Sequence, residues 1–319
     1  MNRPDPTQVR RVAIIGTGVI GSGWTAHFLR QGLEVIAYDP MPEAEARLRQ
    51  KIDAVWPTLE RLGLHPQTDP FRLTFAPDIA SAVSEAEFVQ ENVPERTGLK
   101  SEVFNEIDAA TLPTVVIASS TSGLPMTTLQ KGCRHPERCV VGHPFNPPYL
   151  IPLVEVVGGE QTDPAVMTWT VDFYTAMGKH PLRLEREIPG FLADRLLEAV
   201  WREALHLVAE GLATVEEIDA AMAYGPGLRW AIFGPCLIYH MGGGEGGMAH
   251  FLDQFGPALD LPWSYMAPPE LTPLLRQRLV DGCINEAAGR SIQELERERD
   301  ESLIVILEAL EKYRNGKWV

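Results

Sequence analysis

The stretch RRVAIIGTGVIGSGWTAHFLRQGLEVIAYDP, residues 10–40, decides the fold. Its apolar run at residues 12–15 is typical of a strand that is buried on both faces of a sheet. Glycines in the pattern G-x-G-x-x-G follow directly, and the helix after them is predicted to end at Gly32. A second apolar run, residues 33–38, ends at Asp39. The stretch therefore predicts a strand, a glycine turn, a helix and a second strand.

This arrangement predicts a dinucleotide site. The first glycine of the pattern permits a tight turn, the second leaves room for a pyrophosphate, and the third lets helix and strand pack closely. The helix N-terminus offers unpaired N–H groups to the phosphates. The residues expected to contact the cofactor are Gly16, Thr17, Gly18, Val19, Ile20 and Gly21. The alternative is that these glycines merely form a turn.

Asp39 selects among dinucleotides. It lies 18 positions after Gly21, where a carboxylate accepts hydrogen bonds from a ribose 2′-hydroxyl. A cofactor with a phosphate at that position would need a basic residue nearby, but Pro40 and Met41 follow. We therefore predict NAD as the cofactor.

Composition excludes several classes of protein. The chain has 319 residues with 45% hydrophobic content, enough for one or two globular domains. It contains no run of about 18 apolar residues and no apolar secretion signal, so we expect a soluble, cytoplasmic protein without a membrane partner. The formal net charge of −15 argues against nucleic acid as a partner and slightly favours a cationic ligand.

Cysteine usage does not point to a metal or to disulfides. The four cysteines, at positions 133, 139, 236 and 283, include no C-x-x-C pair and have no metal-type spacing to histidines. We expect reduced cysteines and no metal site.

The pattern along the chain predicts two domains. Further strands are expected at residues 72–75, 87–91, 114–119, 139–142 and 153–157, with helices between several of them. This is a doubly wound, Rossmann-type parallel sheet. Residues from Pro42 have helical character, interrupted at Pro57, which suggests a helix pair. We place an NAD-binding domain at residues 1–188.

After Pro189 the pattern becomes helical. Apolar residues between positions 192 and 208 follow helical spacing, and T-V-E-E at Thr214 and S-I-Q-E at Ser291 have capping-box form. Residues 189–319 are therefore predicted to form an all-α domain that serves the substrate and dimerisation, because an apolar helical domain often completes its core with a second copy. The glycine-dense stretch from Tyr239 is either a mobile loop or a close approach of backbone to ligand.

A second motif, VVGHPFNPPYLIPLVEVV from Val140, predicts acid–base chemistry. Removal of a hydride from a secondary alcohol needs a base for the hydroxyl proton, and histidine titrates near neutral pH. His143 could serve as that base, with Glu155 fixing its tautomer, and Asn146 and Ser122 could add hydrogen bonds. A histidine beside proline is more often structural, however, and Glu155 could be an ordinary strand-edge carboxylate.

The order of five motifs adds specificity. GTGVIGSG, ENVPE, SSTSGL, GHPFNPPYLIPLVEV and PGFLADRLLEA occur in the order found in the 3-hydroxyacyl-CoA dehydrogenase superfamily, which the chain resembles nearly end to end. The resemblance implies His143 as the catalytic base, Glu155 as its partner and Ser122 as a contact of the substrate hydroxyl. It also implies that Glu95, Lys100 and Asn146 line the NAD site.

Two positions depart from the family pattern. Asp194 stands where the family has an active-site asparagine, which removes an amide donor and adds a negative charge. Gly123 replaces the second serine of the family's S-S-L. An extra carboxylate favours a small cationic 3-hydroxy acid over an anionic acyl-CoA.

The second half supports a cationic substrate. Residues 225–263 resemble members of the superfamily that act on carnitine, which carries a trimethylammonium group, a 3-hydroxyl and a carboxylate. Aromatic rings with nearby negative charge hold such ammonium groups. Candidates are Tyr224, Trp230, Phe233, Tyr239 and Trp263, with charge from Asp194 or Glu245. Helical spacing would also place several of these rings in a core. Arg229 is a candidate for the substrate carboxylate or for a surface ion pair.

Three alternatives to oxidation of carnitine remain at this point. Two are enzymes of the same superfamily, acting on L-gulonate or on 3-hydroxybutyryl-CoA, and Asp194 argues against both because their substrates are anionic. The third is a non-catalytic, crystallin-like structural protein that binds the dinucleotide. The presence of Ser122, His143 and Glu155 argues against it.

Overall fold

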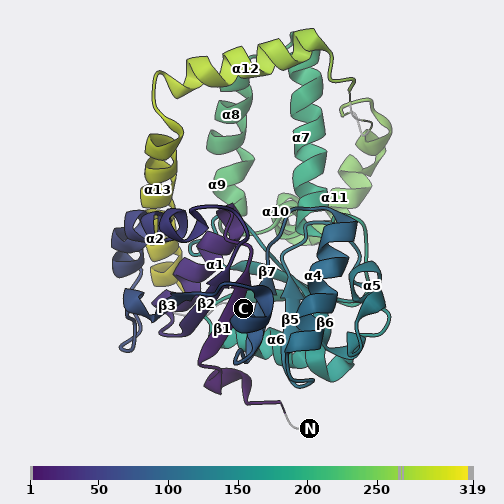
Figure 1. Cartoon of the computed structure of the whole chain (residues 1–319). Coiled ribbons are helices and arrows are strands. Elements are labelled where there is room, and N and C mark those ends of the chain that lie inside the picture. The colour runs from purple at the N-terminus through teal and green to yellow at the C-terminus, as the bar shows by residue number, and fades with distance from the viewer. Residues whose placement is uncertain (1–2, 265–266, 268, 315–319) are drawn as a thin grey trace. The chain divides into compact units, whose positions relative to one another are not determined.

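Two compact units make up the chain, residues 1–195 and residues 196–319. The computed structural model describes residues 3–264, 267 and 269–314 (Figure 1). The first unit holds every strand of the described sheet, and the described part of the second consists of helices and their connections. The predicted fold class is confirmed.

The first unit is built on an eight-stranded sheet with the order β3-β2-β1-β4-β5-β6-β7-β8. All neighbouring strands are parallel except β6 and β7, which are antiparallel. The order reverses at β1 and β4, and the carboxyl ends of strands at such a point form the usual ligand crevice. The strands are β1 Arg11–Ile15, β2 Glu34–Tyr38, β3 Leu73–Phe75, β4 Phe88–Glu91, β5 Val116–Ser119, β6 Cys139–Pro144, β7 Leu153–Gly158 and β8 His180–Leu184.

Helices cover both faces of this sheet. They are α1 Val19–Arg30, α2 Ala44–Arg61, α3 Ile79–Val83, α4 Thr97–Ala110, α5 Met126–Leu129 and α6 Pro164–Ala176. Side chains alternate along a strand, so two successive residues of β4 contact helices on opposite faces of the sheet. Phe88 packs on Phe28 of α1 and Phe173 of α6. Val89 joins a buried cluster with Phe104 of α4.

Three features of the first unit differ from the sequence predictions. α2 runs without a break from Ala44 to Arg61 with Pro57 inside it, so the predicted helix pair is wrong. The β6–β7 pair is antiparallel because only a short loop joins the strands, and a parallel pair would need a long crossover. The strand β8 was not predicted, since three of its five residues are polar or proline.

The described residues of the second unit form helices and the connections between them. α7 Ala193–Ala209 begins in the first unit and continues into the second. The others are α8 Val215–Tyr224, α9 Pro226–Trp230, α10 Pro235–Gly242, α11 Gly247–Phe255, α12 Pro273–Ala287 and α13 Ile292–Arg314. Both predicted capping boxes are present, at Thr214 with Glu217 and at Ser291 with Glu294. The stretch from Tyr239 forms α10, a short 3-10 helix and the start of α11, so most of it is not a loop.

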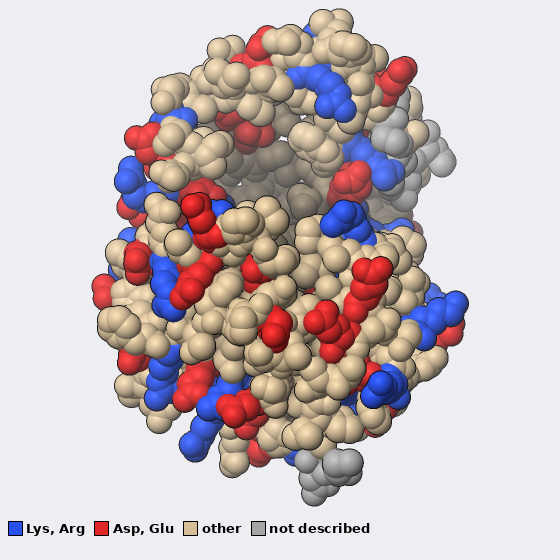
Figure 2. All heavy atoms as spheres, viewed as in Figure 1, with Lys and Arg blue, Asp and Glu red and all other residues tan. Residues whose placement is uncertain are grey.

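Charged side chains of both signs are interspersed on the face shown in Figure 2. Across the described residues, none of the helices is both long and apolar enough to cross a membrane.

Candidate active site

The antiparallel register of β6 and β7 places His143 directly opposite Glu155. Nδ1 of His143 lies 3.0 Å from Oε2 of Glu155, within hydrogen-bonding distance. Directly paired residues of two antiparallel strands hold their side chains on the same face. The structure therefore brings together the two residues that the sequence predicted as a pair, and the strand register fixes their distance.

A turn before α7 completes the surroundings of Glu155. Its second oxygen, Oε1, accepts hydrogen bonds from the backbone N–H groups of Leu192 and Ala193 at 2.8 and 2.9 Å. Gly190 and Phe191 adopt left-handed backbone angles, with φ of 68° and 43°, which aims these N–H groups at the carboxylate. A left-handed phenylalanine is strained by about 1–3 kcal/mol. This turn was not predicted from the sequence, although Pro-Gly-Phe at residues 189–191 is a visible signal for it.

These contacts favour the charged form of Glu155. Complete burial would raise the pKa of this carboxyl, but the hydrogen bonds from His143, Ala193 and Leu192 outweigh that effect and lower its pKa below the ordinary value. A charged Glu155 accepts the Nδ1–H proton of His143, which leaves Nε2 as the nitrogen able to take up a proton.

A second carboxylate approaches the other side of the ring. Oδ2 of Asp194 lies 3.7 Å from Nε2 of His143, and the Asp194 side chain is 29% exposed. The imidazole is thus flanked by a buried carboxylate at Nδ1 and a partly exposed one at Nε2. Both would stabilise an imidazolium, and Asp194 also adds negative charge beside the nitrogen that faces outward.

Aromatic rings enclose the histidine. The rings of Phe145 and Phe191 lie 5.5 and 5.7 Å from the His143 ring, centroid to centroid. His143 is only 5% exposed, whereas Asn146 on the same loop is exposed. The site therefore shields the imidazole from bulk water while keeping polar groups at its rim.

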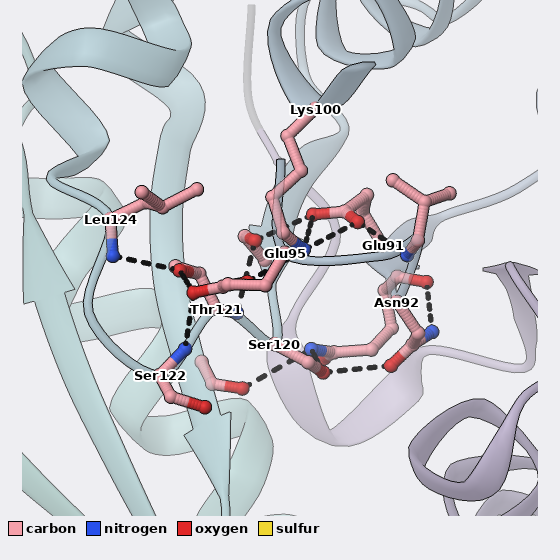
Figure 3. A network of polar contacts seen from close by, with 12 residues as sticks. Glu91, Asn92, Glu95, Lys100, Ser120, Thr121, Ser122 and Leu124 are labelled. Carbon is pink, nitrogen blue, oxygen red and sulfur yellow. Dashed lines mark hydrogen bonds and ion pairs between the residues drawn. The ribbon is translucent and has the colours of Figure 1, made fainter. Parts of the chain in front are cut away.

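Ser122 lies in a loop that Glu95 fixes (Figure 3). Oε1 of Glu95 accepts hydrogen bonds from the hydroxyl of Thr121 at 2.5 Å and from the backbone N–H of Ser122 at 3.1 Å. Gly123, the next residue, approaches the turn before α7, since a Cβ added to it would lie 3.7 Å from the Gly190 nitrogen. Ser122 itself is exposed, so its hydroxyl is available to a ligand.

The side chain of Lys100 extends toward Glu91 and Glu95, as Figure 3 shows. Its ammonium contacts Oε1 of Glu91 at 2.9 Å and Oε2 of Glu95 at 3.5 Å, and the side chain is 1% exposed. Burial raises the pKa of Glu91, opposed by the charge of Lys100 and the hydroxyl of Ser119. Lys100 was predicted to line the cofactor site, and in the structure its charge is directed at these two carboxylates.

The glycine turn after β1 fits a dinucleotide. A Cβ on Gly16 would lie 2.8 Å from the Asn92 backbone, and one on Gly21 would lie 1.9 Å from the Gly16 oxygen, so both positions require glycine. A Cβ on Gly18 would meet nothing within 4 Å, so its backbone faces open space. Gly18 also caps the N-terminus of α1. This is the space that a pyrophosphate needs.

Asp39 lies at the end of β2 beside this turn. Its Oδ2 accepts hydrogen bonds from the backbone N–H and hydroxyl of Thr17 at 2.8 and 3.2 Å, and its Oδ1 accepts one from Met41 N–H at 3.0 Å. These bonds hold the carboxylate at the position from which it would contact a ribose. The residues present therefore fit NAD, with Gly18, Val19 and Ile20 at the phosphates and Asp39 at the ribose.

The remaining substrate candidates belong to the second unit. Tyr224, Trp230, Tyr239 and Trp263 are 82%, 39%, 49% and 74% exposed, so the alternative that these rings form its core is wrong. Phe233 is partly buried and Arg229 is exposed. Tyr239 stacks on Phe251 with centroids 4.9 Å apart.

Within the residues that the structure describes, no group of three or more His, Cys, Asp or Glu side chains is arranged to hold a metal ion.

Comparisons with known proteins identify related sequences. A sequence model of the 3-hydroxyacyl-CoA dehydrogenase NAD binding domain matches residues 11–188, and one of the 3-hydroxyacyl-CoA dehydrogenase C-terminal domain matches residues 190–290. L-carnitine dehydrogenase of Nocardiopsis dassonvillei is 56% identical over 99% of this chain and 96% of its own length. L-carnitine dehydrogenase of Bacillus cereus is 51% identical over 99% of this chain and 97% of its own length.

Solved structures agree with these matches. The crystal structure of 5-formyl-3-hydroxy-2-methylpyridine 4-carboxylic acid 5-dehydrogenase, an NAD+-dependent dismutase, has a TM-score of 0.81 and 31% identity, covering 95% of this chain and 99% of that one. FadB2 of M. tuberculosis has a TM-score of 0.65 and 29% identity, covering 86% of this chain and 94% of that one.

Proposed function

Because this chain belongs to the 3-hydroxyacyl-CoA dehydrogenase family, we propose that it oxidises the 3-hydroxyl of L-carnitine to the ketone of 3-dehydrocarnitine, with NAD as the oxidant. The observation that carries this proposal is the flanking of His143 by two carboxylates, Glu155 at Nδ1 and Asp194 at Nε2. The first is needed for proton transfer from any alcohol. The second favours a substrate that bears a positive charge.

His143 acts as the general base in this proposal. Its Nε2 takes the proton of the substrate hydroxyl, and Glu155 holds the opposite N–H and stabilises the resulting imidazolium. NAD, when bound, accepts the hydride from the carbon that bears the hydroxyl. The hydroxyl of Ser122 and the amide of Asn146 orient the substrate oxygen or the cofactor, and Glu95 keeps the Ser122 loop in place.

Asp194 contributes to substrate choice. A trimethylammonium group carries no N–H donor, so it is recognised by nearby negative charge and by aromatic faces. An anionic thioester carrier or a sugar acid would meet an unfavourable carboxylate beside His143. Four residues of the second unit, Tyr224, Trp230, Phe233 and Arg229, stay predicted substrate contacts on the strength of the sequence resemblance.

A substrate screen tests this function. Purified protein with NAD is mixed separately with L-carnitine, L-gulonate and 3-hydroxybutyryl-CoA, and NADH absorbance is followed. We expect NADH formation with L-carnitine and at least tenfold lower kcat/KM with the other two. Turnover of one of those instead would replace carnitine as the substrate, and NAD binding without turnover of any hydroxy acid would favour a structural role.

We further propose that the protein is a cytoplasmic homodimer whose domains meet at residue 188. Large apolar side chains of the second unit are exposed in the single chain, among them Leu197 at 58%, Trp201 at 49% and Ile284 at 63%. Such surfaces are usually covered by a partner, and a second copy of the chain is the simplest one. Size-exclusion chromatography with light scattering tests this state, and cell fractionation tests the location.

A further inference from the structure

Lys179 carries a buried amino group that the proposed chemistry does not use. It occupies the turn between α6 and β8, after the left-handed Gly178 with φ of 73°. The residue is 7% exposed. Burying an ammonium group is costly unless it finds partners. Its partners therefore show what the position is for.

Those partners belong to the loop between β6 and β7. Nζ of Lys179 donates hydrogen bonds to the carbonyl oxygens of Pro148 and of Ile151, the latter at 3.1 Å. The next residue, His180, donates its backbone N–H to the Pro152 oxygen at 2.8 Å. Residues 179 and 180 thus fasten the loop at three backbone carbonyls.

This loop connects the parts of the active site. It leaves β6 directly after His143 and Pro144, carries Asn146, and enters β7 two residues before Glu155. Within the loop, the Pro147 oxygen accepts hydrogen bonds from Leu150 and Ile151 at 3.0 Å each. A shift of the loop would move Asn146 and disturb the end of the strand that bears His143.

The same lysine ties the loop to the helix that follows the glycine turn. Nζ lies 5.1 Å from the ring centroid of Trp24 on α1, a cation–π distance. Next to it, a Cβ on Gly23 would lie 2.5 Å from Cδ of Pro148, so α1 and the loop touch closely. Trp24 Nε1 also donates to the Ser120 hydroxyl at 3.2 Å, two residues before Ser122. One contact point therefore joins three segments of the site.

From this geometry we propose that Lys179 is a positioning residue for the oxidation step, which holds the Asn146-bearing loop against α1. It touches neither substrate nor cofactor and acts through the carbonyls of Pro148 and Ile151. Misplacement of reacting groups by about 1 Å can lower a rate by about two orders of magnitude. Loss of the Lys179 hydrogen bonds to the loop should therefore lower kcat. The proposal relies on the proposed function only for its assay.

The experiment compares Lys179→Met, Lys179→Arg and a control, Arg183→Met, in the full-length protein. Methionine keeps the length and apolar stem of lysine but cannot donate to either carbonyl, whereas arginine can. Arg183 lies four residues further along the chain and is partly exposed. For each protein, the maximal rate with L-carnitine is divided by the concentration of sites that bind NAD, so that unfolded molecules do not lower the resulting kcat.

We expect Lys179→Met to lose at least tenfold in kcat per NAD-binding site, with NAD affinity within twofold of the wild type. Lys179→Arg should recover most of that loss, and Arg183→Met should match the wild type. A Lys179→Met protein with wild-type kcat per site would overturn the proposal. So would a loss in kcat per site that arginine fails to repair.

Two further outcomes are also decisive. If Lys179→Met does not fold, Lys179→Gln replaces it. Glutamine can donate to one carbonyl, so we expect an intermediate loss of kcat. If neither variant folds, Lys179 is a structural residue and the positioning role is refuted. If the wild type oxidises another 3-hydroxy acid of the screen instead of carnitine, the proposed function fails, but the same proteins are then compared on that substrate.

Discussion

The two units of this chain differ in which side chains they bury and which they expose. Residues 1–195 bury polar groups in matched pairs, such as Glu155 with His143 and Glu91 with Lys100. Residues 196–319 expose large apolar groups, and their described buried hydrophobic side chains are only Leu205, Val208, Leu275 and Ile304. The first unit therefore has a completed core on which a precise site can be built, whereas the second leaves the apolar surface on which we base the proposed dimer.

The largest effect is expected when the imidazole of His143, the proposed general base, is removed. His143→Ala should lower kcat for carnitine by about two to four orders of magnitude, as for loss of a general base. NAD affinity should stay close to the wild-type value, because His143 is not part of the glycine turn. Stopped-flow NADH formation and fluorescence titration with NAD measure the two quantities. His135→Ala, a change at a partly exposed histidine of the same unit, is the control and should keep full activity.

The next effect concerns the apolar surface of the second unit. Leu197→Asp should convert the proposed dimer to a monomer, since burial of one such side chain contributes about 1.5–3 kcal/mol and a symmetric interface buries it twice. Light scattering measures the mass. Lys131→Asp, on the first unit, should leave the dimer intact. A Leu197→Asp protein that remains dimeric would remove this face from the interface.

Glu155→Gln removes the charge of the carboxylate that pairs with His143 but keeps a side chain of similar size. Glutamine keeps an acceptor oxygen but no charge, so the imidazolium loses a stabilising partner. We expect a fall in kcat of roughly tenfold to a hundredfold, smaller than for His143→Ala. The conservative control is Glu160→Gln, at an exposed glutamate. Equal kcat for Glu155→Gln and wild type would show that the charge of Glu155 does not assist the base.

Lys179 of the first unit should make the stability of the protein depend on pH. Burial, together with the nearby charge of Arg30, lowers its pKa to about 7 in the folded protein. The unfolded chain keeps this proton up to the ordinary lysine pKa of 10.5, so the contribution of Lys179 to the free energy of unfolding rises from about pH 7 to about pH 10.5 and does not change further below pH 7. The slope is at most about 1.4 kcal/mol per pH unit. Urea unfolding of wild type and Lys179→Met across this range measures it, and parallel pH profiles would contradict the expected shift.

The smallest effect is expected at the rim of the site. Asp194→Asn removes a partly exposed charge, so KM for carnitine should rise by about threefold to tenfold while NAD affinity is unchanged. The same change should lessen discrimination against the anionic 3-hydroxybutyryl-CoA. An unchanged KM for carnitine would remove Asp194 from recognition of the cation.

Much of the first unit could be predicted from sequence because its signals are local. The glycines at 16, 18 and 21 and the acid at 39 lie in one continuous segment, and the strands from 72 to 157 are short apolar runs. The His143–Glu155 pair was predicted as a possibility, but its distance depends on an antiparallel register that spacing alone does not specify.

What could not be predicted depends on contacts between distant segments. Lys179 gave no sign in sequence of its bonds to the 148–151 backbone, and the Leu192 and Ala193 N–H groups reach Glu155 only because of the left-handed turn before them. Pro57 does not end α2, which continues through it to Arg61, since local propensity is only a weak guide to where a helix ends in a folded protein. The exposed aromatics of the second unit were misjudged because helical spacing reports a covered face without saying what covers it.

The most direct test of the central claim is a crystal structure of the protein with NADH and L-carnitine bound. Proton transfer to His143 predicts the carnitine 3-hydroxyl within about 2.6–3.2 Å of Nε2, with Nδ1 still bonded to Glu155. A substrate hydroxyl held by another side chain, with Nε2 turned away from it, would contradict the account.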